Sequence, residues 1–435
     1  MSLSAACIFL AIVALAPLAA YLFRRGGDPF SPLILIGGVA FGIVDLKLLR
    51  DPRPALRYFP ASAYVEYLLI VALSLLSVYA GWHWRGRRGG QRAVRGGGAL
   101  RAFDPGRLMK AGLLMAVMAL IANLLSLHNV FATGYVKDWY FMQGPAAILL
   151  IQAYMLDRRL LWPVLAGLGA ALFGCINWFF VYGGRGDTAV LLSLVAVPFL
   201  FRGARPRKHW VLIFGFAAAV AMMTLAETRS IVGKGEAPNR VAALVVGGEK
   251  FLHGGSRNYG PGREFVLGTA EVQAVQKLQN WDYGRFVWNE VAVFPPHEWF
   301  PDKIRWQTAW GQGPDGYLHS VRVATGLPWL PGCAPTGFAN AFVEFWWLFP
   351  VFWFVLGYLT RRLYAGAVYG KRLDYQCYLV CMFVGLLYLE TQDFNAATFN
   401  FLFTLLPAWL AYRYARVARV PAARSSPLVG TGASQ

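Results

Sequence analysis

Apolar stretches of about twenty residues recur along this chain, and each is long enough to cross the roughly 30 Å hydrocarbon core of a bilayer. Inside a membrane the backbone must pair its own N–H and C=O groups, so uninterrupted apolar runs of this length indicate helices. Of the 435 residues, 57% are hydrophobic and 14% are charged, whereas about a quarter of a soluble domain is charged. The chain is therefore predicted to be an all-α polytopic membrane protein.

The connectors between the apolar stretches predict about eleven transmembrane helices. The first eight helices lie in residues 1–226, together with a Gly- and Arg-rich cytoplasmic loop over 84–107. One large structured periplasmic loop follows over 227–337. The last three helices lie in residues 338–414, and a cytoplasmic tail covers 415–435. The individual helices are predicted near 4–23, 30–46, 62–83, 108–127, 141–156, 160–180, 187–201, 210–226, 338–359, 375–390 and 396–414.

The basic residues lie beside the predicted span ends. The chain has 41 Lys or Arg against 22 Asp or Glu, a formal net charge of +19. Because cytoplasmic span ends collect Lys and Arg, topology explains most of this charge, and we expect no nucleic-acid partner. The connector KLLRDPRPALRYF over 47–59 is basic on the predicted outer side. Either it binds anionic groups there, or the first two spans are wrong.

The sequence offers neither a disulfide framework nor a metal site. Four of the five cysteines lie in apolar spans, and only Cys333 lies in a long polar segment, where it has no partner for a disulfide. No spacing of cysteine and histidine resembles a zinc site. We expect no cofactor and no metal.

The segment from Glu227 to about Gly337 is the long hydrophilic stretch of the chain, and the predicted topology places it on the outer face. Its sequence TAEVQAVQKLQN has helical apolar spacing at Val272, Val275 and Leu278. Tryptophans recur through the rest at a density unlike that of a flexible linker. Long loops of this kind are usually functional, so we expect the chemistry here.

The turn VYGGRGDTAVLL places Arg185 and Asp187 at the predicted outer start of a membrane helix. Free N–H groups and the helix dipole favour an anion there. The planar guanidinium of Arg185 suits phosphate, and Asp187 can cap the helix. Alternatively, Arg185 only reaches toward the interface as an anchor. An RGD adhesion signal is the weakest interpretation, because the turn lies close to the membrane.

A second basic pair, Arg229 and Lys234, follows the eighth predicted span in AETRSIVGK. Cations at outer span ends suit a lipid-linked pyrophosphate, whose phosphates lie at headgroup depth while its sugars project outward. Their charges can stabilise a departing pyrophosphate. Because the first outer connector has no acidic pair of the DxD type, we expect the chemistry to be independent of metal.

Two stretches, VFPPHEWFPDKIRWQ over 293–307 and CAPTGFANAFVEFWWLFPVFWFVLGYL over 333–359, resemble motifs of the bacterial O-antigen polymerases, the oligosaccharide repeat-unit polymerases. That family carries a loop reading roughly IPR-x-hydrophobic-WPDKP, then a TPTG-like turn that leads into a span with a glutamate. The matching residues are Pro296, Phe300, Pro301, Asp302 and Lys303 in the loop and Thr336, Gly337 and Glu344 after it.

The turn GGR over 183–185 is similar to the family's GSR-like turn, and Arg229 occupies the family's next arginine position. Two positions depart from the pattern. His297 stands where the family has the arginine of IPR, and Ile304, followed by Arg305, replaces the proline after DK. If the family's arginine contacts phosphate, then His297 or Arg305 takes its role.

The resemblance covers about residues 170–360 and implies a GT-C-like glycosyltransferase in the bacterial inner membrane, with its active site facing the periplasm. Such polymerases transfer a growing glycan from undecaprenyl pyrophosphate to a repeat unit on a second undecaprenyl pyrophosphate, for O-antigen, capsule or exopolysaccharide. The implied partners are this lipid-linked oligosaccharide and membrane lipid, with a chain-length regulator and a flippase as further candidates. The residues implied to bind pyrophosphate or glycan are Arg185, Arg229, Lys234, Asp302, Lys303 and Arg305.

An acceptor hydroxyl attacks best with a general base within hydrogen-bonding reach. His297 is the first choice because histidine titrates near neutral pH, although packing on Trp299 would explain it equally well. The other candidates are Glu227, His319 and Glu344.

Glu344 has two interpretations. A charged side chain in the centre of a span costs about 2.5–3.5 kcal/mol, so it is expected to face a partner or a cavity. It either pairs with Arg229 or Arg185 and positions the site, or it takes part in the chemistry directly.

Two other functions stay open. An O-antigen ligase shares the large outer loop but transfers the glycan to a lipid-A core, and the PDK loop favours the polymerase over it. A transporter or flippase for lipid-linked sugars predicts charged residues at mid-membrane and broken helices around them. The polar residues gather instead at outer span ends and in one loop, which favours surface chemistry.

Overall fold

A computed structural model describes residues 2–23, 31–43, 56–84, 103–127, 139–182, 185–204, 206–213, 215, 246, 263–279, 281, 313–327, 336–391 and 394–417. Within these ranges the chain is helical, and its one β-type pairing is the isolated bridge between Phe103 and Arg416. The predicted all-α class is confirmed for this part of the chain.

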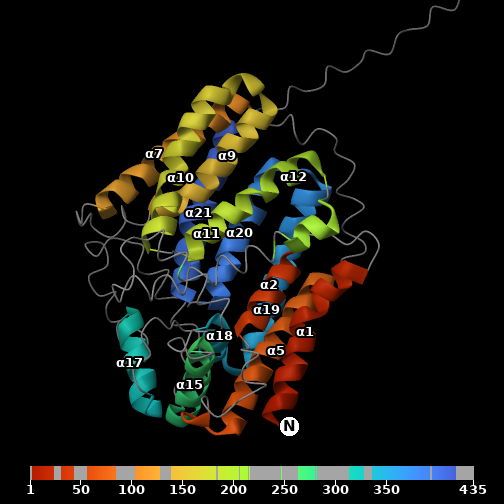
Figure 1. Ribbon diagram of the computed structural model, residues 1–435, viewed down its shortest axis with the longest axis vertical. Helices are drawn as coiled ribbons and strands as arrows, with labels where there is room; N and C mark the ends of the chain where they lie inside the picture. The colour runs from red at the N-terminus through yellow and green to blue at the C-terminus, as the bar shows by residue number, and fades with distance from the viewer. Residues whose placement is uncertain are drawn as a thin grey trace, which may run out of the picture.

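The helices pack in two groups joined by a central one (Figure 1). In chain order they are α1 (Leu3–Phe23), α2 (Pro32–Ile43), α5 (Ala61–His83), α7 (Pro105–Leu127), α9 (Gln143–Leu156), α10 (Leu161–Tyr182), α11 (Arg185–Leu194), α12 (Ala196–Arg202), α15 (Arg263–Leu278), α17 (Gly313–Thr325), α18 (Gly337–Phe345), α19 (Phe349–Tyr364), α20 (Leu373–Thr391) and α21 (Phe394–Ala415). Helices α7, α9, α10 and α21 form one group, and α1, α2, α5 and α19 form the other. Helix α20 contacts both groups.

Five segments of the described chain are long and apolar enough to cross a membrane: Leu3–Phe23, Ala61–His83, Pro105–Leu125, Arg158–Ile176 and Gly337–Tyr369. Shorter apolar helices cover Ala189–Arg202 and Leu373–Leu389. These segments support a helical membrane protein. The predicted total of about eleven spans and the GT-C-like arrangement stay predictions, and most of the span predicted over 210–226 lies outside the described residues.

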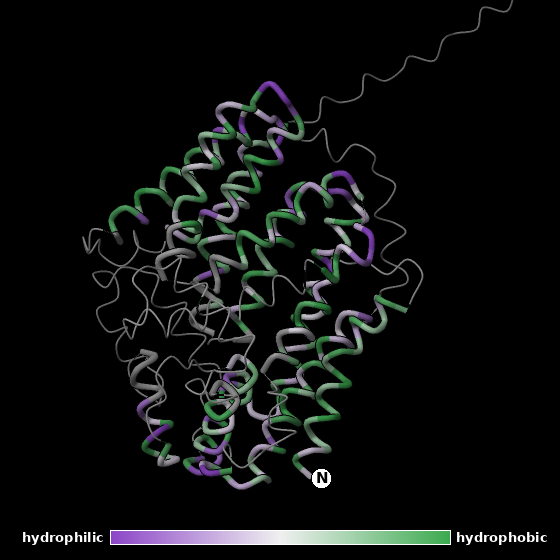
Figure 2. The backbone as a smooth tube through the Cα atoms, in the orientation of Figure 1, coloured by the Kyte–Doolittle hydropathy of each residue, from purple (hydrophilic) through white to green (hydrophobic). Residues whose placement is uncertain are grey.

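Helix ends that carry basic residues meet at one end of the bundle, which we call the basic end. The Lys208 ammonium donates to the Leu22 carbonyl at 2.6 Å and so joins the chain after α12 to the end of α1. The Gln376 amide donates to the Leu200 carbonyl at 3.0 Å and joins the start of α20 to α12. Figure 2 shows hydrophilic segments along this edge. Its basic residues include Arg158, Arg159, Arg202, Lys208, Arg361, Arg362, Arg372 and Arg416.

A buried carboxylate holds part of the basic end together. Asp374, in the first turn of α20, is 4% exposed and lies 2.6 Å from Nη2 of Arg372 and 3.9 Å from Nη2 of Arg416. The hydrogen bond to Asp374 raises the pKa of the Arg372 guanidinium, a group that is charged at physiological pH in any case. An acidic residue in the first turn also stabilises the helix, because its negative charge lies near the positive end of the helix dipole.

The opposite end of the bundle, which we call the α15 end, carries the start of α1 together with α15 and α17 (Figure 1). The helix predicted within TAEVQAVQKLQN is observed as part of α15. Val272 and Val275 are fully buried, whereas Leu278 is 48% exposed. Of the apolar stripe predicted for this helix, two positions therefore face the core and the last one does not.

Helices α5 and α19 approach so closely that glycine is required on both. A Cβ at Gly81 would overlap the Phe354 carbonyl, and a Cβ at Gly357 would overlap the Val78 carbonyl. Small residues let membrane helices bring their backbones together and gain van der Waals contact. Beside this contact the Arg361 guanidinium lies 5.0 Å from the centre of the Trp82 ring.

The single helix predicted over 338–359 is divided in two by the residues between α18 and α19. Trp346 ends α18 with a φ of 49°, a left-handed conformation that is costly for a bulky residue. Pro350, in the first turn of α19, suits the start of a new helix because it has no N–H to donate. Helix α18 is therefore a separate short element, packed against α5, α15 and α20.

We predict that Gly357→Ala and Gly81→Ala lower the melting temperature of the purified protein, because the added methyl group forces α5 and α19 apart. Overpacking of this kind costs about 1–3 kcal/mol. Thermal unfolding in detergent measures it. Gly169→Ala in α10 is the matched control, since a Cβ there meets nothing within 4 Å. Equal melting temperatures for the Gly357 and Gly169 variants would contradict this packing.

Candidate functional site

Of the residues predicted to form the site, two fall within the described ranges. Glu344 lies in α18, and Arg185 is the first residue of α11. His319, the alternative base, lies in α17 and is exposed. The residues that lie outside the described ranges are Glu227, Arg229, Lys234, His297, Asp302, Lys303 and Arg305.

The helix that carries Glu344 begins with a side-chain cap. The Thr336 hydroxyl accepts a hydrogen bond from the Ala339 N–H at 3.3 Å, which satisfies one of the free donors at the helix start. Gly337 follows it because a Cβ there would overlap the Leu389 carbonyl of α20. Residues 337–344 are all buried, and Glu344 itself is 1% exposed. The carboxylate is therefore inside the protein, not on its membrane-facing surface.

The structure brings a second buried carboxylate, Glu271 of α15, to the same helix. Glu271 is 0% exposed, and one of its oxygens accepts from the Asn340 side-chain amide at 3.4 Å. Asn340 and Glu344 are four residues apart in α18, so they share one face of that helix. The Asn340 amide thus contacts one buried carboxylate, Glu271, and shares a helix face with a second, Glu344.

Polar side chains of α5 hold α15 and α18 in this arrangement. The Glu66 carboxylate accepts from the Gln276 amide and, at 3.3 Å, from the Gln273 amide. The Tyr67 and Thr336 hydroxyls are 2.8 Å apart, and both residues are fully buried. We name the whole set the α15–α18 polar cluster, which comprises Glu66, Tyr67, Glu271, Gln273, Gln276, Thr336, Asn340 and Glu344.

An aromatic contact closes the far end of α18. The Trp281 ring lies 5.2 Å from the Phe342 ring and 5.5 Å from the Trp346 ring. Trp281 belongs to the hydrophilic segment 227–337, so a residue of that segment covers the point where α18 ends. At least one tryptophan predicted in this segment is therefore used for packing.

The cluster combines groups that can bind sugar hydroxyls and hold protons. Carboxylates accept hydrogen bonds, amides both donate and accept, and a buried carboxylate is a general base if an acceptor hydroxyl reaches it. Within the part of the chain that the structure describes, no group of three or more His, Cys, Asp or Glu side chains is placed to hold a metal.

Sequence reasoning missed Glu271 and Asn340. A signal for Glu271 was present, because positions 271, 275 and 278 follow the helical spacing of the predicted apolar stripe. A carboxylate on that stripe indicates a buried acid. Asn340 carries no comparable signal, since an isolated amide in an apolar helix has many explanations.

Arg185 begins α11, a helix of 10 residues that packs against α9, α10 and α20. Since α12 continues from α11 to the basic end at Arg202, Arg185 stands toward the opposite end of the bundle. The start of α11 and the α15–α18 polar cluster therefore lie toward the same end.

Against protein-family models, curated protein sequences and solved structures, the chain gives no match.

We predict that Tyr67→Phe and Thr336→Val each destabilise the protein, because each leaves a buried hydroxyl without this partner. The expected cost is about 1–3 kcal/mol for each single variant. The double variant should cost less than the sum, since neither hydroxyl then remains. Thermal unfolding of the four proteins gives the coupling.

Thr336→Ser is the control for this cycle, because it keeps both the hydroxyl and the helix cap. It should unfold close to the wild-type temperature. Strictly additive losses would mean that the two hydroxyls do not interact.

Proposed function

We propose that this protein is a glycosyltransferase that polymerises lipid-linked oligosaccharide repeat units, with undecaprenyl-pyrophosphate glycans as donor and acceptor. The observation that carries the proposal is the α15–α18 polar cluster. In it, a helix from the large hydrophilic segment packs against α18, which carries the buried carboxylate Glu344, in a membrane bundle. A carboxylate in such a place is costly, which favours a functional reason for keeping it.

Of the three residues that resemble the O-antigen polymerases after the PDK loop, Thr336 and Glu344 belong to this cluster and Gly337 lies beside it at the start of α18. Thr336 caps α18 and contacts Tyr67. Gly337 permits the close approach of α20, and Glu344 is the buried carboxylate. Each of the three matching positions thus has a structural role at the start of α18 or in its buried face. The agreement therefore supports the resemblance.

In the proposed reaction, an acceptor sugar hydroxyl attacks the anomeric carbon of the donor glycan. A C–O bond forms there while the bond from that carbon to the pyrophosphate oxygen breaks, and the hydroxyl proton passes to a base. His297 remains the first candidate for the base, with Glu344 and Glu227 as alternatives. The cations Arg185, Arg229, Lys234, Lys303 and Arg305 would stabilise the departing pyrophosphate, and Asp302 would bind the glycan.

The proposed orientation follows from the basic end. Since cytoplasmic ends of membrane helices collect Lys and Arg, the basic end would face the cytoplasm of a bacterial inner membrane. The α15 end would then face the periplasm. Glycan repeat units attached to lipid at that surface could be joined without crossing the membrane again.

The break between α18 and α19 favours a second candidate, a transporter or flippase of lipid-linked sugars. Transporters bind their substrates at interrupted helices, and here Glu344 lies two residues before the left-handed Trp346. Helices α11 and α12 are also separated, at Val195. Glycosyl transfer remains the first candidate because the polar residues of the cluster lie at one end of the bundle.

We predict that Arg185→Ala, expressed in cells whose surface polysaccharide is resolved on a gel, leaves only single-repeat glycan. Loss of the guanidinium removes charge that would stabilise the leaving pyrophosphate, and removal of one such group typically lowers turnover about 100- to 1,000-fold. Arg185→Lys should keep part of the ladder, because it keeps the charge but not the planar fork.

Protein abundance in the membrane is measured beside the ladder. An unchanged ladder in both Arg185 variants at normal abundance would reduce Arg185 to an interfacial anchor. Loss of all glycan, single-repeat units included, would instead favour the transporter.

For Glu344→Gln we expect normal protein abundance and a glycan ladder reduced to its shortest members. The amide keeps the shape of the side chain but can take no proton, and a general base contributes about 100- to 10,000-fold to a rate. Purified protein supplied with lipid-linked repeat units allows the rate to be measured directly. Wild-type rates in Glu344→Gln, at the same abundance, would exclude Glu344 as the base.

A further inference from the structure

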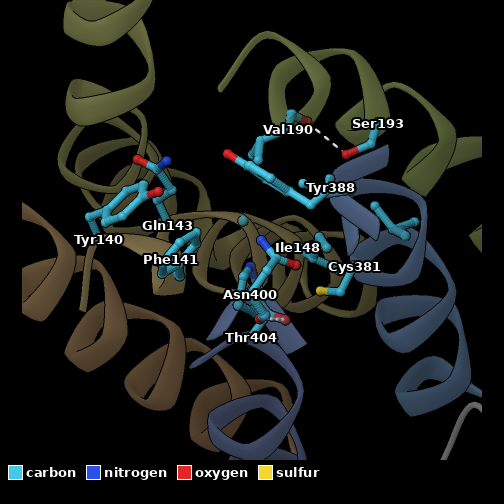
Figure 3. Close-up of a pocket in the computed structure, with 14 residues that line it drawn as sticks. Tyr140, Phe141, Gln143, Ile148, Val190, Ser193, Cys381, Tyr388, Asn400 and Thr404 are labelled. Carbon is cyan, nitrogen blue, oxygen red and sulfur yellow. Dashed lines mark hydrogen bonds between the residues drawn. The ribbon is translucent and has the colours of Figure 1, made fainter. Parts of the chain in front are cut away.

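A small cavity lies between α9, α11, α20 and α21, away from the α15–α18 polar cluster (Figure 3). Its volume is about 20 Å³, which is room for one water molecule or for the hydroxyl of a larger ligand. Among the described residues that line it, none is charged. The polar residues of its wall are Tyr140, Gln143, Ser193, Tyr388, Asn400 and Thr404.

Asn400 is the strongest sign that the cavity takes a ligand. This residue is 2% exposed, and among the described residues its side-chain oxygen has no hydrogen-bond partner. Figure 3 shows its amide within the cavity, beside Cys381 and Ile148. A buried polar atom left without a partner costs free energy, so such atoms call for a specific explanation. A hydroxyl group in the cavity could donate to this oxygen.

The two aliphatic hydroxyls of the wall do not fill this role. The Thr404 hydroxyl donates to the backbone carbonyl of Asn400 at 2.5 Å. The Ser193 hydroxyl donates to the Val190 carbonyl at 2.7 Å, as the dashed line in Figure 3 shows. Both donors are therefore committed to their own helices, and the Asn400 oxygen stays available to a ligand.

Two helices that line the cavity, α20 and α11, also carry or contact residues of the proposed site. Tyr388 is followed in α20 by Leu389, whose carbonyl faces Gly337 at the start of α18. Val190 is five residues after Arg185 in α11. The cavity is thus lined by α11, which begins with Arg185, and by α20, which contacts the start of the helix that carries Glu344.

We infer that this cavity is a subsite for one hydroxyl group of a neutral sugar, with the Asn400 side-chain oxygen as its acceptor. The inference rests on the proposed function, since it names where a sugar of the lipid-linked glycan is recognised. Aromatic rings and amides are the groups that fix a polar, uncharged ligand in a concave site, and the wall supplies Tyr140, Phe141 and Tyr388 as rings.

Other ligands fit the wall less well. A phosphate or carboxylate would need a cation or an array of donors, and the described lining has no charged group. A lipid acyl chain would bury the amide and hydroxyl groups against hydrocarbon, which costs free energy for each one left unpaired. A neutral hydroxyl satisfies Asn400 without adding charge, as a single water molecule in the cavity also would.

The test measures sugar binding directly, without the transfer reaction. Purified full-length protein in phospholipid nanodiscs is titrated with D-glucose, D-galactose, D-mannose and N-acetyl-D-glucosamine, each alone, and saturation-transfer NMR reports binding. We expect at least one of these sugars to bind the wild-type protein. Asn400→Leu, which keeps the side-chain volume but removes the amide, should bind that sugar roughly two- to tenfold more weakly, as expected for one neutral hydrogen bond.

Thr404→Val and Thr360→Val form a matched control pair. Both threonines are buried and donate to a carbonyl four residues earlier, but only Thr404 lines the cavity. Thr404→Val should weaken sugar binding and Thr360→Val should not. Equal binding by both, or undiminished binding by Asn400→Leu, overturns the subsite.

The outcomes separate this inference from the proposed function. If none of the four sugars binds the wild type, the cavity holds water only and the subsite is wrong, whatever the Arg185 variants show. If a sugar binds through Asn400 while Arg185→Ala abolishes all glycan, single-repeat units included, the subsite stands and the polymerase proposal gives way to the transporter.

Discussion

The close contact between α5 and α19 supports the arrangement of the rest of the structure. Lipid is as apolar as the helix surfaces, so burial alone does not hold membrane helices together and contact between backbones has to. Gly81 and Gly357 make that contact possible. It fixes where α19 begins, and therefore where the chain must turn after α18. It also leaves the first turns of α5 available to α15 and α18.

Those first turns of α5 explain how a site can be assembled from distant parts of the sequence. Glu66 and Tyr67 bind residues of α15 and of the α18 cap. The carboxylates Glu271 and Glu344 are each nearly or fully buried, a costly state that persists only where neighbouring groups compensate. The α15 helix is thus part of the buried core, although it comes from the most hydrophilic segment of the chain. The same contacts that stabilise the fold therefore determine which groups face one another in the cluster.

Much of the fold was predictable, because apolar length and helical periodicity are local properties. The helices at 3–23, 61–83 and 105–127 begin and end within about three residues of their predicted bounds. The division at Trp346 was not predictable, since tryptophan has no intrinsic tendency toward positive φ and the surrounding contacts impose it. Glu344 was identified from a motif, whereas its neighbour Glu271 depends on how two distant helices meet. Pairings of that kind arise from tertiary packing, which a single sequence does not display.

The distribution of polar groups along the bundle helps to distinguish a glycosyltransferase from a transporter of lipid-linked sugars. A transport path needs polar groups through the full thickness of the membrane, and it places its binding site near the midplane. In the described residues the α15–α18 polar cluster lies at the α15 end and the charged groups of the basic end lie at the other, while the wall of the cavity at Asn400 includes residues near the middle of their helices, such as Cys381 and Thr404. Ser74, near the middle of α5, and Thr360, close to the basic end, bond to carbonyls of their own helices. Such residues give a passing substrate no continuous set of partners. A substrate that reacts at one surface requires only the groups found at the α15 end. The arrangement therefore favours glycosyl transfer over transport across the membrane.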